Sequence, residues 1–204
     1  MGKKEEFLRV FRLAERKYEK SEKRLAGEGW GAAWKTLIAT IMSAQSRDET
    51  TILIGERLFK RYGTLEKLAN ARYADVYKIF SGLNYNKTKA KHVIAAAKIL
   101  ISEFNEKVPD SIEELVKLPG VGRKTANLVL TKEHGKDGIT TDTHVHRISN
   151  VIGLVKTKTP NQTELALMKI APRKYWSRIN RLFVLWGKEV SGRDRKKLLR
   201  KLEE

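Results

Sequence analysis

The sequence predicts an all-α protein of about ten short helices, and three observations support this prediction. Apolar residues recur at three- and four-residue spacing along most of the 204-residue chain, which is the period of an amphipathic helix. No segment shows the strict alternation of apolar and polar residues that predicts a strand. The chain has only four prolines and no low-complexity linker, so short turns are expected to separate the helices.

Three apolar stripes define the clearest helices. In chain order they are Phe7, Val10, Phe11, Ala14 and Tyr18; then Val93, Ala97, Leu100 and Phe104; then Trp176, Ile179, Phe183 and Trp186. Turns are predicted at residues 27–31, 63, 82, 108–110, 119–122, 135–138 and 159–161. Asp110 and Ser111 each precede a glutamate by three residues, which is the capping-box pattern of a helix N-terminus. The segment SGRDRKKLLRKLEE at residues 191–204 is predicted to be a frayed or edge helix.

The charge of the chain indicates a polyanionic partner. It carries 42 Lys and Arg residues against 24 Asp and Glu residues, a net charge of +18. A field of this strength attracts polyanions and raises their encounter rate. Nucleic acid is therefore the expected partner, although charge alone does not distinguish DNA from RNA or from a membrane surface.

Several classes of protein are excluded by composition. The chain has no cysteine, which excludes disulfides, thiolate-bound zinc, iron-sulfur clusters and a cysteine nucleophile. No run approaches the roughly 18 apolar residues that suggest a membrane span. The start, MGKKEEFLRVF, lacks the apolar core of a secretory signal. We therefore expect a soluble, intracellular protein with no membrane association.

The segment IEELVKLPGVGRKTANLVL, at about residues 112–130, predicts a helix-hairpin-helix. Glycines at 120 and 122 permit backbone conformations and close approaches that a Cβ would obstruct. The amides at the start of the second helix can then bind a phosphate. The residues expected to contact DNA are Pro119, Gly120, Val121, Gly122, Arg123 and Thr125. By itself this motif indicates DNA binding and gives almost no support for catalysis.

A second motif is ITTDTHVHRISNVIGLV, in which Asp142 begins a helix. Amide donors at a helix N-terminus stabilise an aspartate as the carboxylate. Plain helix capping is the simpler explanation of this residue. His144 and His146 face different directions on a helix, so no metal site formed by side chains is expected.

Four segments together resemble a known family. SAQSRD (Ser43 to Asp48), VPDSIEELVKLPGVG, LPGVGRKTAN and TDTHVHRIS occur in order between about Trp34 and Trp186. They are similar to the helix-hairpin-helix superfamily of base-excision DNA glycosylases, HhH-GPD, and within it to endonuclease III. The resemblance implies a two-lobe helical fold with the active site in the cleft between the lobes. Residues 27–136 would form the central lobe, and residues 1–26 with 137–204 the second.

The resemblance also implies the roles of individual residues. Lys124 would attack the sugar C1′ and form a Schiff base, from which β-elimination cleaves the strand. Asp142 would accept the lysine's proton or stabilise positive charge on the sugar. Gln45 would enter the space left by the flipped nucleotide. Tyr85 would wedge the opposite strand, with Leu83 as the competing residue.

The implied activity is removal of oxidised or ring-saturated pyrimidines from double-stranded DNA, followed by abasic-site lyase chemistry. A glycosylase for mismatched or deaminated bases and a non-catalytic DNA-binding module are the alternatives. We expect a nucleoid-associated monomer without a cofactor. A monovalent cation on the backbone of Leu118, Gly120 and Val121 is the one ion that the family's hairpin suggests.

The sequence departs from endonuclease III at its C-terminal end. The family follows its last helix with four cysteines that bind a four-iron cluster, and this chain has none. We expect aromatic packing by Trp176, Phe183 and Trp186 to compensate for the lost cluster. The lost positive surface would be replaced by Lys188, Arg193, Arg195, Lys196 and Lys197.

Overall fold

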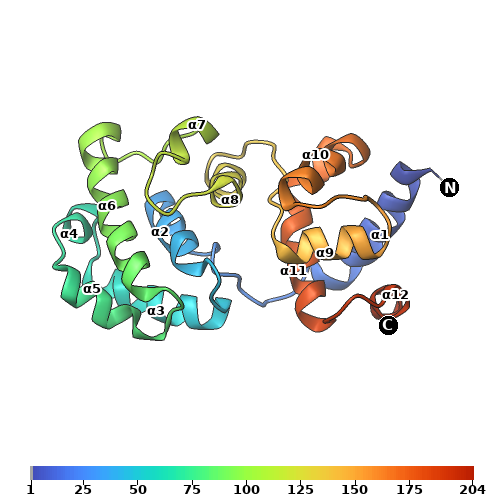
Figure 1. Cartoon of the computed structure of the whole chain (residues 1–204), viewed down its shortest axis with the longest axis horizontal. Helices are drawn as coiled ribbons and strands as arrows, with labels where there is room; N and C mark the ends of the chain where they lie inside the picture. Colours follow the sequence, from blue (N-terminus) through green and yellow to red (C-terminus); the bar gives the residue numbers. More distant parts are fainter. Residues whose placement is uncertain (1) are drawn as a thin grey trace. The chain divides into compact units, whose positions relative to one another are not determined.

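The computed structural model describes residues 2–204, within which every regular element is helical (Figure 1). In chain order the elements are α1 (Lys3–Tyr18), α2 (Ala33–Ser43), α3 (Asp48–Arg61), α4 (Leu65–Ala69), α5 (Tyr73–Ile79), η1 (Phe80–Gly82), α6 (Asn86–Phe104), α7 (Ile112–Leu115), α8 (Arg123–Glu133), α9 (Thr143–Val151), α10 (Pro160–Ile170), η2 (Arg173–Tyr175), α11 (Trp176–Glu189) and α12 (Arg195–Glu203). The prediction of an all-α fold is confirmed. The predicted number of helices is low because α4 and α7 span only five and four residues, too few to show a helical period.

The chain divides into two compact units. The central unit is Arg24–Lys136, and the terminal unit combines Met1–Lys23, described from residue 2 onward, with Asp137–Glu204. The sequence analysis predicts that the central unit begins at residue 27, whereas it begins at Arg24. Arg24 belongs with the central unit because its guanidinium donates to the carbonyl oxygens of Glu28 and Gly29 and pairs with Glu56 at 3.1 Å.

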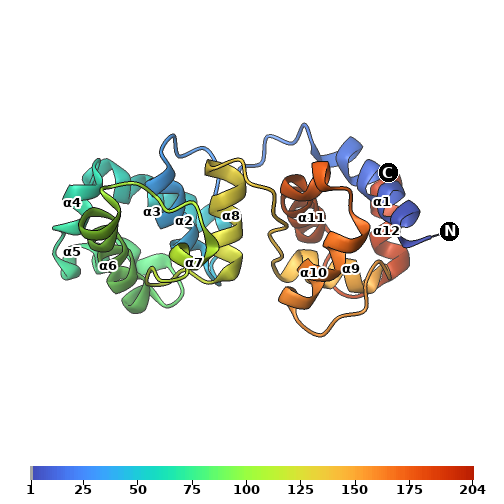
Figure 2. The same ribbon diagram turned by 90° about the horizontal axis from the view of Figure 1, so that it is seen from above.

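The core of the central unit surrounds α2. All residues from Thr36 to Met42 are buried, because this helix is apolar on nearly every face and must be covered on every side. It packs against α3, α6 and α8, and Figure 2 shows α8 lying beside α2. The helix that follows the hairpin is thereby held against the centre of the unit.

The hairpin turn is fixed by close contact with two of these helices. Ser111 caps α7, accepting from the Glu114 amide at 3.3 Å, and the Val121 amide closes the turn by donating to the Leu118 carbonyl at 3.1 Å. Gly120 adopts φ +80°, and a Cβ on it would lie 2.8 Å from His92 Nδ1 and 2.9 Å from Ile41 Cγ2. Only glycine fits a left-handed conformation this close to α6 and α2.

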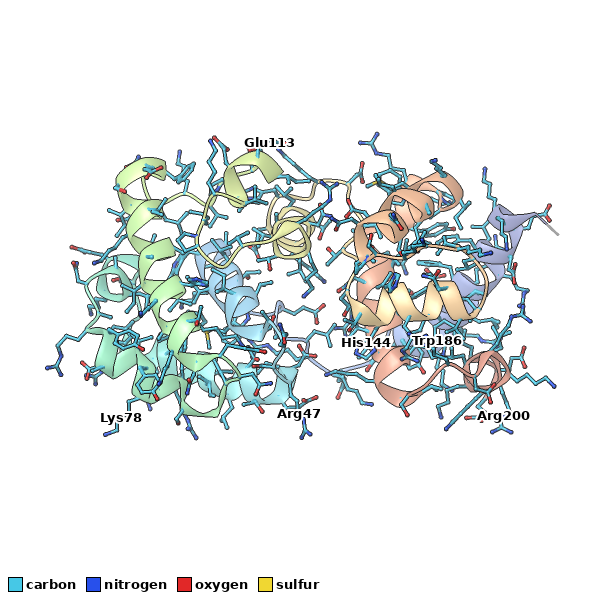
Figure 3. The ribbon with its side chains drawn as sticks, in the orientation of Figure 1. Arg47, Lys78, Glu113, His144, Trp186 and Arg200 are labelled. Carbon is cyan, nitrogen blue, oxygen red and sulfur yellow. The ribbon has the colours of Figure 1, made fainter. Side chains whose placement is uncertain are left out.

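The terminal unit is built from both ends of the chain (Figure 1). The predicted apolar face of α1 is buried in full: Phe7, Val10, Phe11, Ala14 and Tyr18. This helix packs on α11 and α12, and α11 also packs on α9. Trp186 lies in the core, with its ring edge-on to Phe183 at 5.5 Å between centroids, and His144 of α9 lies on the adjoining helix (Figure 3).

The last helix is packed through one face, which agrees with the prediction of an edge helix and not with that of a frayed one. Leu198 and Leu202 of α12 are 0% and 2% exposed. The Trp186 indole donates to the Leu198 carbonyl at 3.1 Å, and Asp194 caps the helix by accepting from the Lys197 amide at 3.0 Å. The segment before α12 is held by Arg147, whose guanidinium donates to the carbonyl oxygens of Gly187, Val190 and Gly192.

None of the helices within residues 2–204 combines the length and the apolar character needed to cross a membrane.

Replacing Leu198 with alanine should lower the free energy of unfolding by about 2–5 kcal/mol, because a fully buried leucine leaves a cavity when truncated. Lys197→Ala is the matched control, since that side chain is exposed on the same helix and should change stability by less than about 0.5 kcal/mol. Urea denaturation measures both. Equal stability of the two variants would show that α12 contributes nothing to the core.

Replacing Gly120 with alanine should destabilise the central unit by about 1–3 kcal/mol, because the new methyl group overlaps His92 and Ile41. Gly122→Ala is the control, since its Cβ would meet nothing within 4 Å. Thermal denaturation gives the stabilities, and titration with undamaged duplex gives the affinities. A Gly120→Ala protein as stable as the Gly122→Ala protein would contradict the packing of this turn.

Candidate DNA-binding and catalytic site

The start of α8 offers backbone amides to a ligand. Gly122 is the N-cap residue, with φ −98° and ψ 176°, and no side chain caps the helix. The Ala126 amide makes the first hydrogen bond of the helix, to the Gly122 carbonyl at 2.9 Å. The N-terminal turn of a helix binds anions through its amides and its dipole, so this turn suits a phosphate.

The residues predicted to contact DNA differ in exposure. Gly120, Gly122 and Arg123 are exposed and Pro119 is half-buried, whereas Val121 and Thr125 are each 7% exposed and Leu118 is 2% exposed. Val121 and Thr125 can therefore offer little beyond their backbone atoms. This arrangement suits contact with the sugar-phosphate backbone, which carries no sequence information.

Lys124 is the second residue of α8 and is half-buried in the central unit. The helix begins immediately after the hairpin turn, so the position of the amine follows from the packing of Gly120 on α2 and α6. Lys124 thus lies in the helical turn whose amides suit a phosphate.

Asp142 lies in the terminal unit, where it is the N-cap of α9. Its Oδ1 accepts from the Val145 amide at 2.9 Å, so capping fixes the direction of the side chain. A carboxylate has two oxygens and several acceptor positions, and capping through Oδ1 is compatible with a further role. Burial lowers the pKa of Arg147 on the same helix, and the negative charge of Asp142 opposes that fall.

The residues predicted to enter the duplex are distinguished by burial. Gln45 and Tyr85 are exposed, and Tyr85 retains 66% of its accessible surface. Leu83 is 5% exposed and belongs to the core of the central unit. Of the two residues considered for the wedge, Tyr85 is therefore the one with its side chain at the surface.

Three polar residues near these loops were missed by the sequence analysis. Asn84 donates to the Gln45 carbonyl at 2.5 Å and, through its amide, to Ser46 Oγ at 3.1 Å. The Lys89 amine donates to the same Ser46 Oγ at 2.9 Å. Burial lowers the pKa of Lys89 to about 8. The signal was present in the sequence: Lys89 stands one helical turn before Val93, on the apolar stripe of its helix.

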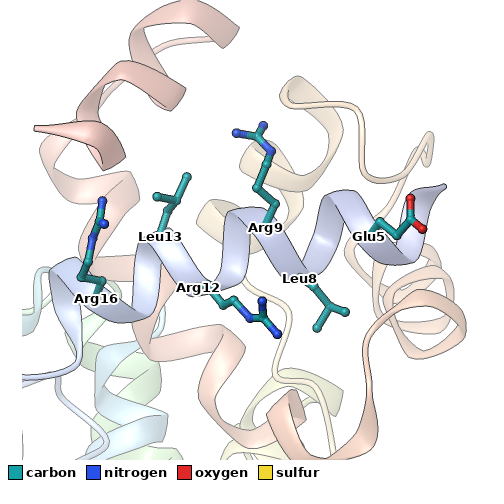
Figure 4. A pocket seen from close by; sticks show the side chains of 6 residues that line it. All are labelled: Glu5, Leu8, Arg9, Arg12, Leu13 and Arg16. Atoms are coloured by element: carbon teal, nitrogen blue, oxygen red, sulfur yellow. The ribbon is translucent and has the colours of Figure 1, made fainter. Parts of the chain in front are cut away.

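Positive charge is also presented by the outer face of α1. Leu8, Leu13 and Glu5 line a shallow groove of about 500 Å³ together with Arg9, Arg12 and Arg16, whose side chains are exposed (Figure 4). The basic residues predicted near the C-terminal end are exposed as well: Lys188, Arg193, Arg195, Lys196 and Lys197. Arg195 is partly engaged, donating to the Ile152 carbonyl at 3.2 Å and pairing with Glu6 at 3.3 Å.

The donor set does not fit the iron-sulfur cluster that the family resemblance implies. Such a cluster is held by cysteine thiolates, and the chain has none. In the place expected for the cluster loop, the chain forms the segment held by Arg147 and the helix α12.

Comparison with known proteins agrees with this geometry. A family model described as HhH-GPD superfamily base excision DNA repair protein matches residues 38–173. Endonuclease III of Thermotoga maritima is 43% identical over 157 residues, covering 77% of this chain and 74% of the relative. Endonuclease III of Rickettsia conorii is 39% identical over 154 residues, covering 76% and 73%.

Solved structures show the same relationship. A trapped endonuclease III-DNA covalent intermediate, in an estranged-adenine complex, is similar with a TM-score of 0.85 and 28% identity, over 93% of this chain and 88% of that one. A non-covalent endonuclease III-DNA complex also gives a TM-score of 0.85 at 28% identity, over 92% and 87%. The resemblance predicted from the sequence motifs is confirmed: the chain belongs to the HhH-GPD superfamily of base excision DNA repair proteins.

Proposed function

We propose that this chain removes oxidised or ring-saturated pyrimidines from double-stranded DNA and then cleaves the strand at the abasic site, with Lys124 as the nucleophile. Its family and its endonuclease III relatives make it a bifunctional base-excision repair enzyme, a DNA glycosylase and abasic-site lyase. The observation that supports the role of Lys124 is its place in the first turn of α8, beside amides suited to a phosphate.

The chemistry begins with a neutral amine. Lys124 Nζ forms a bond to the sugar C1′ as the glycosidic bond breaks, and the base leaves with a proton. Opening of the sugar ring gives a protonated Schiff base, which acidifies the proton on C2′. Loss of that proton expels the 3′ phosphate and cleaves the strand, and water then releases the lysine.

Asp142 supplies the negative charge that these reaction steps require. Its carboxylate accepts the proton of the lysine ammonium or stabilises the positive charge that develops on the sugar as the base departs. The hydrogen bond from the Val145 amide to Asp142 Oδ1 keeps the carboxylate in one orientation. A carboxylate held in advance costs little reorganisation during the reaction.

Gln45 and Tyr85 are the residues that we assign to the duplex. A base within a duplex is reached only after its nucleotide is extruded, so one side chain must fill the gap and another must separate the opposite strand. Gln45 fills the gap in this proposal. Tyr85 is the wedge, because Leu83 is buried.

The proposal also covers the oligomeric state, the location and the bound ions of the enzyme. The enzyme acts as a monomer in the cytoplasm, associated with the nucleoid, and needs no iron-sulfur cluster, since it lacks the thiolates. A monovalent cation on the carbonyl oxygens around Leu118, Gly120 and Val121 would add charge opposite a phosphate.

Lys124→Ala should abolish covalent trapping. Incubation of the parent protein with duplex containing an abasic site, followed by borohydride, should give a stable protein-DNA adduct. Lys117→Ala, which removes an exposed lysine from the same hairpin, should still be trapped. Trapping of Lys124→Ala at the parental level would remove this residue from the mechanism.

Release of oxidised pyrimidines in preference to uracil, mismatched thymine and 8-oxoguanine tests the proposed substrate class.

Asp142→Asn should preserve the fold and lower the rate of base release by about 10²–10⁴-fold, since asparagine caps a helix as well as aspartate but carries no charge. Asp194→Asn is the matched control, because Asp194 caps α12 in the same way. Single-turnover base release and melting temperature are measured for both. If the two substitutions have equal effects on rate, Asp142 is a cap and nothing more.

A further inference from the structure

Two loops of the central unit that lie far apart in the sequence are bonded to each other. The first follows α2 and contains Gln45 and Ser46, and the second precedes α6 and contains Asn84 and Tyr85. Asn84 joins them twice, through its side chain to the Gln45 carbonyl at 2.5 Å and through its amide to Ser46 Oγ at 3.1 Å. These bonds hold the backbones of the two loops in one arrangement.

Lys89 supports this junction from the interior. It lies in the first turns of α6, is 4% exposed, and donates from Nζ to Ser46 Oγ at 2.9 Å. The hydroxyl oxygen of Ser46 thus accepts from both Asn84 and Lys89, which uses both of its lone pairs. A lysine is rarely buried unless it is paired, and here it is buried against a serine that links two loops.

The backbone at the tips of the loops is unusual. Gln45 has φ +52° and Tyr85 has φ +55°, and residues other than glycine rarely adopt this left-handed region, which costs about 1–2 kcal/mol each. Such conformations persist only where the surrounding structure imposes them, and they cluster at functional sites. Both strained residues are the ones whose exposed side chains are assigned to the duplex.

We propose that Lys89 is a positioning residue: through Ser46 it locks the two loops into one rigid wedge, so that Gln45 and Tyr85 enter the duplex together. This inference rests on the proposed function, because it takes Gln45 and Tyr85 as the inserted side chains. Burial lowers the pKa of the Lys89 amine, so the charged form is disfavoured at this position.

The test compares Lys89→Met with Lys87→Met. Methionine fills the volume of the buried lysine stem without its donors, and Lys87 is an exposed lysine on the same turn of α6. Duplex DNA carries a tetrahydrofuran residue, a stable abasic analogue, opposite 2-aminopurine. Insertion of the wedge unstacks the 2-aminopurine and raises its fluorescence, and this signal requires no chemistry.

We expect Lys89→Met to lose most of the fluorescence increase at saturating protein and to release bases from damaged duplex about 10²-fold more slowly in single turnover, because a displacement near 1 Å can cost that much. Cleavage of a single-stranded abasic oligonucleotide, which has no partner strand to wedge, should stay within about threefold of the parent. The melting temperature should not fall, since a desolvated charge is removed. Lys87→Met should match the parent in fluorescence and in base release.

A double-mutant cycle tests whether Lys89 acts through its hydrogen bond to Ser46. Ser46→Ala should reproduce the loss, and the double variant should be no worse than either single variant, because residues that act through one bond are not additive. Parental fluorescence and base release in Lys89→Met would overturn the proposal. The proposal would also be overturned if Lys89→Met lost single-stranded cleavage to the same extent and had a lower melting temperature, because that result would indicate a folding defect.

The two proposals fail in different ways. If the parent protein forms no borohydride adduct, the lysine chemistry is wrong, yet the fluorescence comparison still reports on the wedge. If the parent is trapped and Lys89→Met behaves like it in every assay, the wedge proposal alone is wrong.

Discussion

The contact of Gly120 with His92 and Ile41 is the constraint on which the central unit depends. It sets the hairpin turn against α6 and α2, and so fixes where α8 begins. The same two helices carry the loops with the exposed Gln45 and Tyr85, since α2 leads into one loop and α6 follows the other. The positions of the hairpin turn, Lys124, Gln45 and Tyr85 therefore all depend on a single pair of packed helices. A shift of the turn would move these groups relative to one another.

Much of this arrangement could be predicted from the sequence because its signals are local. The turn before α8 and the cap at Asp142 depend on backbone geometry within a few residues, and the structure contains both as predicted helix starts. The short helices α4 and α7 were not predictable from period, because neither completes two turns. The packing of α12 depends on Trp186 and on α1, which a reading of the segment alone does not include.

The choice between Leu83 and Tyr85 as the wedge residue could be made only from the tertiary structure. Leu83 and Tyr85 stand two positions apart in one short segment, and sequence reasoning left both open. Folding buries Leu83 in the core and leaves Tyr85 outside. The bonds among Asn84, Ser46 and Lys89 cross a long sequence separation, so no local pattern could reveal them. The lysine on an apolar stripe was the only trace, and by itself it is ambiguous.

The terminal unit has a consequence for the order in which the chain folds. Residues 24–136 form a continuous segment whose contacts can all be made once that segment has left the ribosome. Helix α1 is synthesised before this segment, yet the surfaces that cover Phe7 and Phe11 belong to α11 and its neighbours, which are synthesised after it. During translation the apolar face of this amphipathic helix is therefore without its partners, and exposed apolar surface of this kind favours aggregation and chaperone binding.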